Sequence, residues 1–453
     1  MAAGRASTAL SLRKHAQGEA ARLAGALPSR SCPPVSPATL TYPCQSQGVT
    51  YNPRRLRSHG EAPNMGNALQ WARDSHPQIV EFRRRFHRHP EVAWEEIQTT
   101  AFVADRCRSV GLNVRLLEGR TGLVADLNAD RPGPLLAFRA DLDALPIQEE
   151  APLPFRSAIA GKAHVCGHDA HTAMLLGAVG ILARIREQLP FPIRFLFQPA
   201  EEVVPGGAKA FIDAGYLDGV AEIFGLHVTP QLPVGTLGTR SGALMASMDR
   251  FELTVTGLGG HGAMPHLTHD PLPVAAEIVL ALQTIVGRRV DPLEPAVVSV
   301  CQIAAGDAFN VIPQECRMAG TARSLSGGTG KRLEQWIGEI GEGVARAHGL
   351  KAVLKYEHGT PVLANRAESV EKMLRAFRAL GGRDQEIPAT MGGEDFAFYL
   401  ERVPGCFAFL GAGSEATREG GSLHHPRFGI DEEALAWGSA TFVQLALDRA
   451  AQE

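Results

Sequence analysis

Cysteine is scarce in this sequence, and the few cysteines do not form the arrangements that disulfide scaffolds or zinc ribbons require. Only 7 of the 453 residues are cysteine, and no CxxC pair occurs. They lie at Cys32, Cys44, Cys107, Cys166, Cys301, Cys316 and Cys406. This scatter excludes a disulfide framework and argues against a closed structural zinc site. We therefore predict a reducing compartment, the cytoplasm.

Long uncharged apolar runs and excess positive charge are also lacking. No such run reaches the roughly 18 residues that span a bilayer, so we predict no membrane segment. A net charge of −3 argues against nucleic acid as a main partner. Hydrophobic residues at 45% and charged residues at 21% are typical of a globular protein. The length predicts two domains.

The first 64 residues have few acidic side chains. They carry eight Lys and Arg residues against Glu19 and Glu61, and no strand or long apolar period occurs. Composition of this kind is typical of disorder. Two explanations stay open: an organelle transit peptide, or a true translation start at Met65. Proline-rich stretches such as SCPPVSPATLTYP fit a transit helix poorly and favour the second.

A dense cluster of metal-binding side chains stands out against this background. The segment HVCGHDAH, residues 164–171, contains His164, Cys166, His168, Asp169 and His171. Thiolate, imidazole and carboxylate groups bind Zn²⁺ and similar ions. Gly167 lets the backbone fold tightly enough for both of its neighbours to face one ion. A buried cysteine with surface histidines would explain one such residue, but five together predict a metal site on a loop that enters a helix.

Strands and helices alternate around this cluster. Strand-like segments at 122–128, 135–143, 193–202 and 221–228 alternate with helical segments at 172–187 and 207–214. This order predicts an α/β domain with a mainly parallel sheet and helices on both faces. Polar residues end three of the strands, namely Asp141 with Asp143, Glu201 with Glu202, and His227. Since ligands bind at the carboxyl ends of parallel strands, these side chains are expected to converge.

The pattern changes between about 246 and 356. Strands and helices there follow the order β-α-β-β-α-β, which predicts an inserted ferredoxin-like α+β domain. The catalytic domain would then comprise residues 67–245 and 357–453. The short alternating edge strands of the insert would permit pairing with a second copy.

The proposed metal ligands are Cys166, His168, Glu202, His227 and His424, which with a bridging water would hold two divalent ions. Glu201 and Glu202 are neighbours, so in extended backbone their side chains point in opposite directions. We assign Glu202 to the metal, and Glu201 to the water as general base and then general acid.

Other residues receive supporting roles. Asp143 is expected to orient a ligand histidine, with a simple turn acid as the alternative. One of His424 and His425 is expected to ligate, and we treat His164 and His171 as structural residues or as residues that contact the ligands from outside. In the inserted domain, His261 is placed to donate to an oxyanion. Asn310 and Arg323 lie on the same module, and an arginine fork there suggests a substrate with a free carboxylate, unless Arg323 is a plain surface residue.

Eight ordered motifs carry a family resemblance: CGHDAH, QPAEE, GLHV, GLGGHGAMPH, FNVIP, GTAR, GGEDFAFY and LHHPRF. Over residues 67–448 the chain resembles the dinuclear metallopeptidase/aminoacylase family, in the branch of hippurate hydrolases, N-acyl-amino-acid amidohydrolases and auxin–amino-acid conjugate hydrolases. The resemblance implies hydrolysis of N-acyl amino acids with two Mn or Zn ions, and a lid domain that forms a homodimer or higher homo-oligomer. It also implies that the five ligands and Glu201 keep these roles, and that His261 reaches the partner's site.

Two other functions remain as alternatives. A cysteine hydrolase would use Cys166 as nucleophile with a nearby histidine as base, but it leaves Glu202, His227 and His424 unexplained. A non-catalytic binding protein for acyl-amino acids would not need Glu201 beside the ligand set.

Overall fold

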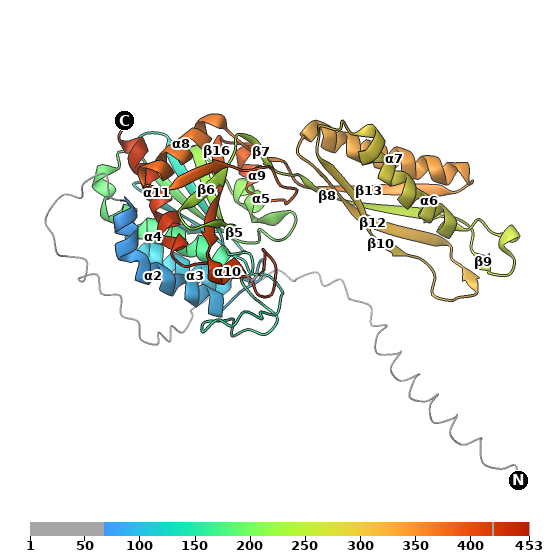
Figure 1. The fold of residues 1–453 in the computed structure, drawn as a ribbon, viewed down its shortest axis with the longest axis horizontal. Coiled ribbons are helices and arrows are strands. Elements are labelled where there is room, and N and C mark those ends of the chain that lie inside the picture. Colours follow the sequence, from blue (N-terminus) through green and yellow to red (C-terminus); the bar gives the residue numbers. More distant parts are fainter. Residues whose placement is uncertain (1–67, 419–420, 453) are drawn as a thin grey trace, which may run out of the picture. The chain divides into compact units, whose positions relative to one another are not determined.

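The computed structural model describes residues 68–418 and 421–452. The leader of residues 1–64, and with it the choice between a transit peptide and a start at Met65, lies outside the described residues. The described chain forms an eight-stranded sheet and a separate four-stranded sheet, each with its own hydrophobic core (Figure 1).

The eight-stranded sheet has the order β1-β2-β4-β3-β5-β16-β6-β15. Its strands are β1 (Asn113–Leu116), β2 (Leu123–Leu127), β3 (Leu135–Asp141), β4 (Ile193–Gln198), β5 (Val220–Pro233), β6 (Thr236–Thr239), β15 (Arg383–Glu386) and β16 (Gly405–Gly413). The central strands β4, β3, β5 and β16 are parallel. At the edges, β1 and β2 run antiparallel, and β6 joins β16 antiparallel. The predicted α/β sheet is therefore confirmed, with a parallel centre and mixed edges.

Helices cover both faces of this sheet. One face packs against α2 (Ala68–Arg88), α3 (Ile97–Ser109), α4 (His168–Arg184), α8 (Ala367–Ala379) and α11 (Ala434–Ala450). The other face packs against α5 (Gly206–Asp213), α9 (Ala397–Leu400) and the ladder of β7 (Gly242–Met245) with β14 (Leu363–Asn365). The short helices η2 (Arg186–Gln188) and α10 (Glu415–Arg418) lie in connections.

Helix α2 continues through Pro77, and Ala68 and Ala72 extend its buried stripe toward the N-terminus. Helix α4 begins earlier than the sequence predicts. The helix expected from 172 starts at His168, so three of the five cluster residues (His168, Asp169 and His171) lie on α4 rather than on the preceding loop.

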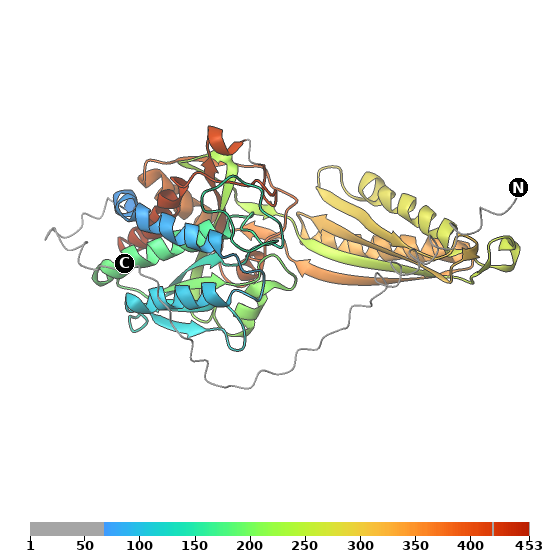
Figure 2. The same ribbon diagram turned by 90° about the horizontal axis from the view of Figure 1, so that it is seen from below.

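The four-stranded sheet is the inserted domain. Its elements are β8 (Met248–Thr256), α6 (Pro271–Thr284), β10 (Ala296–Ala304), β12 (Glu315–Ser324), α7 (Gly327–Ala347) and β13 (Lys351–Thr360). The spatial order β10-β12-β8-β13 is antiparallel throughout, which confirms the ferredoxin-like topology (Figure 2). A small ladder of β9 (Gly260–His261) and β11 (Val311–Ile312) adjoins η3 (Pro265–Leu267). The exact boundaries at 246 and 356 stay a prediction.

One helix in the described part of the chain is long and apolar enough to cross a membrane by length and composition alone. It comprises α6 and the following turn η4 (Ile285–Arg289). Its residues Val274, Ile278 and Leu282 are buried in the core of the inserted domain. This packing accounts for the buried side of the helix, whereas Leu272 and Leu280 are exposed. The absence of a membrane segment stays a prediction.

Candidate metal centre

The five side chains chosen as ligands come from four separate segments and meet at the carboxyl ends of the parallel strands. The Cys166 Sγ lies 3.4 Å from His227 Nε2. The Glu202 Oε1 lies 3.2 Å from His424 Nε2 and 3.9 Å from His168 Nε2. Two triads with ligand atoms within 4.8 Å of one another, Cys166–His168–His227 and Cys166–Glu202–His424, share the thiol. Two overlapping triads of this kind are compatible with two neighbouring ions.

The backbone at Gly167 forms the tight turn that the spacing predicts. Its φ is +97°, and a Cβ there would lie 2.4 Å from Val228 Cγ2. Only glycine adopts this conformation without strain. The Gly167 carbonyl also accepts hydrogen bonds from the N–H groups of Ala170 and His171, at 2.9 and 3.1 Å, so the same turn starts α4.

Asp143 binds both the metal loop and the acidic pair. Its two carboxylate oxygens accept the backbone N–H groups of Glu201 and Glu202, each at 3.0 Å. The His168 Nδ1–H donates to the same carboxylate at 3.3 Å. This contact leaves His168 Nε2 facing the other candidate ligands, and Asp143 is bonded both to this histidine and to the acidic turn.

The expected extended backbone at Glu201 and Glu202 is wrong. Strand β4 ends at Gln198, and Ala200 has a φ of +53° that turns the chain. Both carboxylates approach His168 within the same cluster. What distinguishes the two is therefore their neighbours: Glu202 adjoins Cys166 and His424, whereas Glu201 adjoins a second acidic pair.

The imidazole rings have fixed tautomers. The His227 Nδ1–H donates to Val228 O at 2.8 Å, which leaves Nε2 free toward Cys166. His171 uses both of its nitrogens: Nδ1–H donates to Asp141 Oδ1 at 2.6 Å, and Nε2 accepts the Val228 N–H at 2.8 Å. His171 is thus a structural residue, as the sequence suggests, although it lies close to the ligands.

Two buried atoms in this group lack a hydrogen bond of good geometry, namely His168 Nε2 and Glu202 Oε1, although His424 Nε2 lies 3.2 Å from the second. Burial also raises the pKa of the Cys166 thiol well above its usual value, and the nearby His168 offsets this only in part. Unpaired buried lone pairs and a thiol that resists ionisation are unfavourable. A divalent cation would satisfy the lone pairs and promote thiolate formation, so the donor set fits metal ions.

Glu201 has the environment of a proton carrier. Its pKa is raised well above the ordinary value by burial and by the neighbouring carboxylates of Glu394 and Glu202. Its Oε1 accepts the backbone N–H of Asp395 at 3.4 Å. A carboxyl whose pKa is raised binds a proton more readily than an ordinary carboxylate, as a group that takes and returns a proton must.

Comparison with known proteins agrees with this site. Residues 137–448 match the Peptidase family M20/M25/M40. The chain belongs to this family. It is 39% identical over 373 residues to an N-acetylcysteine deacetylase of Bacillus subtilis, covering 82% of this chain and 97% of that protein.

Two further relatives extend the comparison. An IAA-amino acid hydrolase (ILR1-like 2) of Arabidopsis thaliana is 37% identical, covering 82% of this chain and 84% of that protein. The crystal structure of a dinuclear metal binding peptidase of the M20 family from Bacillus subtilis superposes with a TM-score of 0.75 at 35% identity, covering 84% and 99% of the two chains. The present chain is therefore a hydrolase of the M20 family, and its candidate ligand groups fit divalent metal ions.

At the adjacent histidines of this M20 protein, the geometry favours His424. Its Nε2 faces Glu202, and its φ of +66° is one of four positive values at non-glycine residues of the described chain. The ring of His425 is exposed, and its Nδ1 accepts the Arg427 N–H at 3.1 Å. His164 is buried beside the cluster, and burial lowers its pKa to about 4.

The residues predicted on the inserted domain are not joined to the ligands by any contact within the described chain. His261 and Asn310 lie together where β9 meets β11, and the Gly262 N–H donates to Asn310 O at 2.8 Å. Arg323 is partly buried, and its Nη1 donates to Met391 O at 3.1 Å. Arg323 therefore contacts the loop that leads to Glu394.

Two features near the site were missed from the sequence. One is the fully buried Arg139, which pairs with Asp141, Glu394 and Asp395. Glu394 and Asp395 lie in the motif GGEDFAFY, and Arg139 lies in the strand segment FRAD. Charged residues within apolar segments were the sequence signal that could have indicated this buried ionic group.

The second missed feature is a buried ionic clamp around His87. Its Nδ1 lies 2.9 Å from Asp169 Oδ2, and its Nε2 lies 3.0 Å from Glu149 Oε1. Arg83 donates to Asp169 at 3.1 Å and to Glu432 at 3.0 Å. The clamp ties α2 to the first turn of α4, directly beside the ligand His168.

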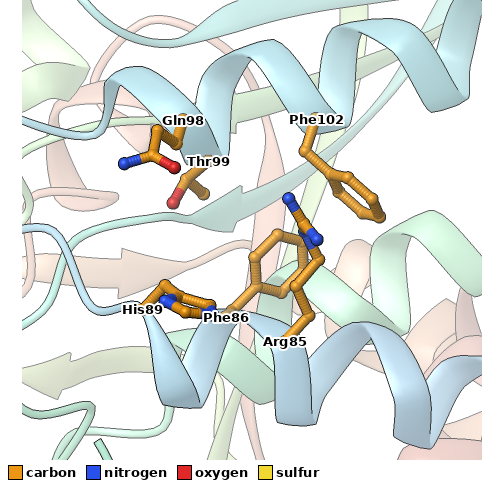
Figure 3. Close-up of a pocket in the computed structure, with 6 residues that line it drawn as sticks. All are labelled: Arg85, Phe86, His89, Gln98, Thr99 and Phe102. Carbon is orange, nitrogen blue, oxygen red and sulfur yellow. The ribbon is translucent and has the colours of Figure 1, made fainter. Parts of the chain in front are cut away.

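A small pocket between α2 and α3 is not part of this site. Figure 3 shows its lining, which consists of Arg85, Phe86, His89, Gln98, Thr99 and Phe102. The cavity measures about 20 Å³, which is room for a single water rather than a substrate. The Arg85 guanidinium lies over the Phe102 ring at 4.5 Å, so we interpret the pocket as a packing feature.

Proposed function

We propose that this protein hydrolyses the amide bond of N-acyl amino acids, hippurate-like or related conjugates, and releases a carboxylic acid and an amino acid. The observation that carries the proposal is Glu201, a carboxylate that adjoins the ligand cluster but is left out of its thiol-sharing triads. The deacetylase and conjugate-hydrolase names of the relatives support the same chemistry.

The chain's own residues would act as follows. Cys166, His168, Glu202, His227 and His424 hold the ions. When bound, the ions lower the pKa of a water molecule and polarise the amide carbonyl. Glu201 takes a proton from the attacking water and then delivers it to the leaving nitrogen. Asp143 keeps the turn of Glu201 in place through the two backbone hydrogen bonds.

The inserted domain would supply substrate contacts. We assign His261 to the oxyanion of the tetrahedral intermediate, and Asn310 and Arg323 to the free carboxylate of the amino acid. The exposed ring of His261 is accessible for such a contact. Arg323 contacts the loop before Glu394, so a substrate carboxylate bound by Arg323 would lie near the acidic residues around Glu201.

A second copy of the chain is the proposed partner. Several large apolar side chains of the inserted domain are exposed, among them Leu267, Ile303, Phe309 and Val311. Ile303 belongs to β10, an edge strand. Exposed apolar residues beside an open edge are typical of an interface. We expect a homodimer by light scattering, and Phe309→Glu should shift the mass toward the monomer.

A cysteine hydrolase is disfavoured by the site. A nucleophilic thiol needs a lowered pKa, whereas burial raises the pKa of Cys166. Activity that survives complete removal of metal would reinstate this alternative. If the protein were a non-catalytic binding protein, acyl-amino acids would bind to it but would not be hydrolysed.

The experiment that tests the proposal is a turnover assay on benzoyl-glycine and a panel of acetyl-amino acids, with Mn²⁺ or Zn²⁺ added back to metal-free protein. Glu201→Gln should lower kcat by at least about 100-fold, as expected for lost general acid–base catalysis, and should still bind metal. Glu222→Gln is the matched control, since Glu222 is a buried carboxylate at the other end of β5, paired with Ser369 and Lys372. Equal activities in the two variants would refute the role of Glu201.

A further inference from the structure

Arg139 is a charged residue in the interior of the catalytic domain, on the central strand β3. Its side chain is only 1% exposed. Each side of the guanidinium has a partner: Nε donates to Gln198 Oε1 at 2.9 Å, Nη1 to Asp141 Oδ2 at 2.6 Å, and Nη2 to Asp395 Oδ1 at 2.8 Å. The Glu394 Oε1 lies 3.0 Å from Nη2. A buried guanidinium is tolerated only with such complete pairing, which also fixes its orientation.

One arm of this network leads to Glu201. The Asp395 carboxylate is held by Arg139 and by Gln198 Nε2, at 3.0 and 2.8 Å from its two oxygens. It also accepts the Ala208 N–H of α5 at 3.0 Å. The backbone N–H of the same Asp395 donates to Glu201 Oε1. The side chain of Asp395 therefore fixes the peptide group that contacts the proton-handling carboxylate.

The other arm leads to a metal ligand. Asp141 receives Arg139 on one oxygen and the His171 Nδ1–H on the other. The His171 Nε2 accepts the Val228 N–H, and Val228 O accepts the His227 Nδ1–H. Short hydrogen bonds thus join the guanidinium, through Asp141 and His171, to the backbone N–H of Val228, and the carbonyl of the same residue orients the His227 ring.

We propose that Arg139 is a positioning residue that holds the base Glu201 and the ligand His227 in a fixed mutual arrangement. This inference rests on the proposed function, because it assigns Glu201 a role in turnover. Arg139 acts through Asp395 on one side and through Asp141 and His171 on the other. Its planar fork is essential, since three divergent N–H directions reach three acceptors at once.

Lysine in place of Arg139 keeps the charge but loses the fork. We expect Arg139→Lys to lower kcat by about 10- to 100-fold, the range typical of residues that orient metal-site groups. The KM should stay within about threefold, because Arg139 does not touch the substrate. Metal content, measured by equilibrium dialysis and elemental analysis, should remain two ions per chain with weaker retention.

Arg194→Lys is the matched control. Arg194 is a buried arginine on the neighbouring strand β4, and it donates to both Asp126 oxygens at 2.7 and 3.0 Å, apart from the metal ligands. It should lose stability with kcat unchanged. A kcat for Arg139→Lys that equals the parent value, or a loss that Arg194→Lys reproduces, overturns the proposal.

A second variant covers the case in which Arg139→Lys does not fold. Asp395→Asn keeps the side-chain shape and weakens the contacts of the carboxylate with Arg139, Gln198 and the Ala208 N–H, and with them the support of the peptide that contacts Glu201. We expect the same fall in kcat with unchanged KM, and an unchanged kcat refutes the inference. If the parent protein hydrolyses no N-acyl amino acid, the proposed function fails instead, so the two failures are distinguishable.

Discussion

Asp143→Asn is the sharpest perturbation of the metal centre, because one carboxylate accepts three hydrogen bonds there. Two come from the backbone N–H groups of Glu201 and Glu202, and one comes from His168 Nδ1. Asparagine preserves the shape but replaces one acceptor oxygen by an NH₂ group. That NH₂ group would face either a backbone N–H of the acidic turn or the His168 Nδ1–H. Both groups are donors, so no hydrogen bond would form there.

The magnitude follows from this mismatch. A buried donor left without an acceptor costs about 1–3 kcal/mol, and hydrogen bonds to a charged acceptor contribute about 1.5–3 kcal/mol. Part of the lost hydrogen-bond free energy is recovered when the backbone at Glu201 and Glu202 relaxes. We therefore expect metal affinity to fall by about 10- to 100-fold, or about 1.4–2.8 kcal/mol, in line with other residues that orient ligands.

The assay is competitive titration of metal-free protein with Zn²⁺ against a chromophoric chelator, together with thermal unfolding of the metal-free form. Asp126→Asn is the control, since Asp126 is a buried carboxylate paired with Arg194. It should lower the Tm without changing metal affinity. Equal metal affinity in Asp143→Asn and the parent protein would refute the role of Asp143 as an organiser of the ligands.

Three further results are expected. Gly167→Ala should lose at least about 1–2 kcal/mol of stability from the left-handed backbone alone, with weaker metal binding in the same titration, because its Cβ would meet Val228. Saturation with Mn²⁺ or Zn²⁺ at about 100 times Kd should raise the free energy of unfolding by about 2.7 kcal/mol, seen as a higher Tm. Burial and the nearby charge of Arg83 both lower the pKa of His87. The hydrogen bonds to Asp169 and Glu149 outweigh these two effects, so the pKa of His87 is raised. The clamp's contribution to the free energy of unfolding is complete below the unfolded-state pKa of histidine, about 6.5. It is lost as the pH rises through the pKa of His87 in the folded protein. The stability gap between the parent and His87→Gln, from urea unfolding, should therefore narrow as pH rises; a gap that widens would contradict this.

The side chains proposed as ligands lie close together in the structure, and the sequence signals for them are local. Cys166 and His168 stand in one short motif, and Glu202 and His227 follow apolar strands whose ends coincide in a parallel sheet. The inserted domain is predictable for a similar reason, since its six elements follow a familiar order with clear periodicity. Strands of four residues, such as β1, β6 and β15, are too short to give such a pattern.

Long-range ionic contacts were beyond sequence reasoning. Arg139 and Asp395 are 256 positions apart, and Arg83 and Glu432 are 349 apart. No periodicity signals which buried charges will pair. The turn at Ala200 is a similar case, because a positive φ at alanine is set by the contacts of Asp143 with the following residues.

The fifth ligand follows the inserted domain, whereas the other four precede it. During synthesis on the ribosome, the segments with Cys166, His168, Glu202 and His227 emerge long before His424, and the entire insert must be made in between. The nascent chain can therefore form at most the thiol–imidazole half of the centre until its last helix is nearly complete. Ion loading should be a late event in the biogenesis of this protein, and truncation shortly before His424 should leave a product that binds one ion at most.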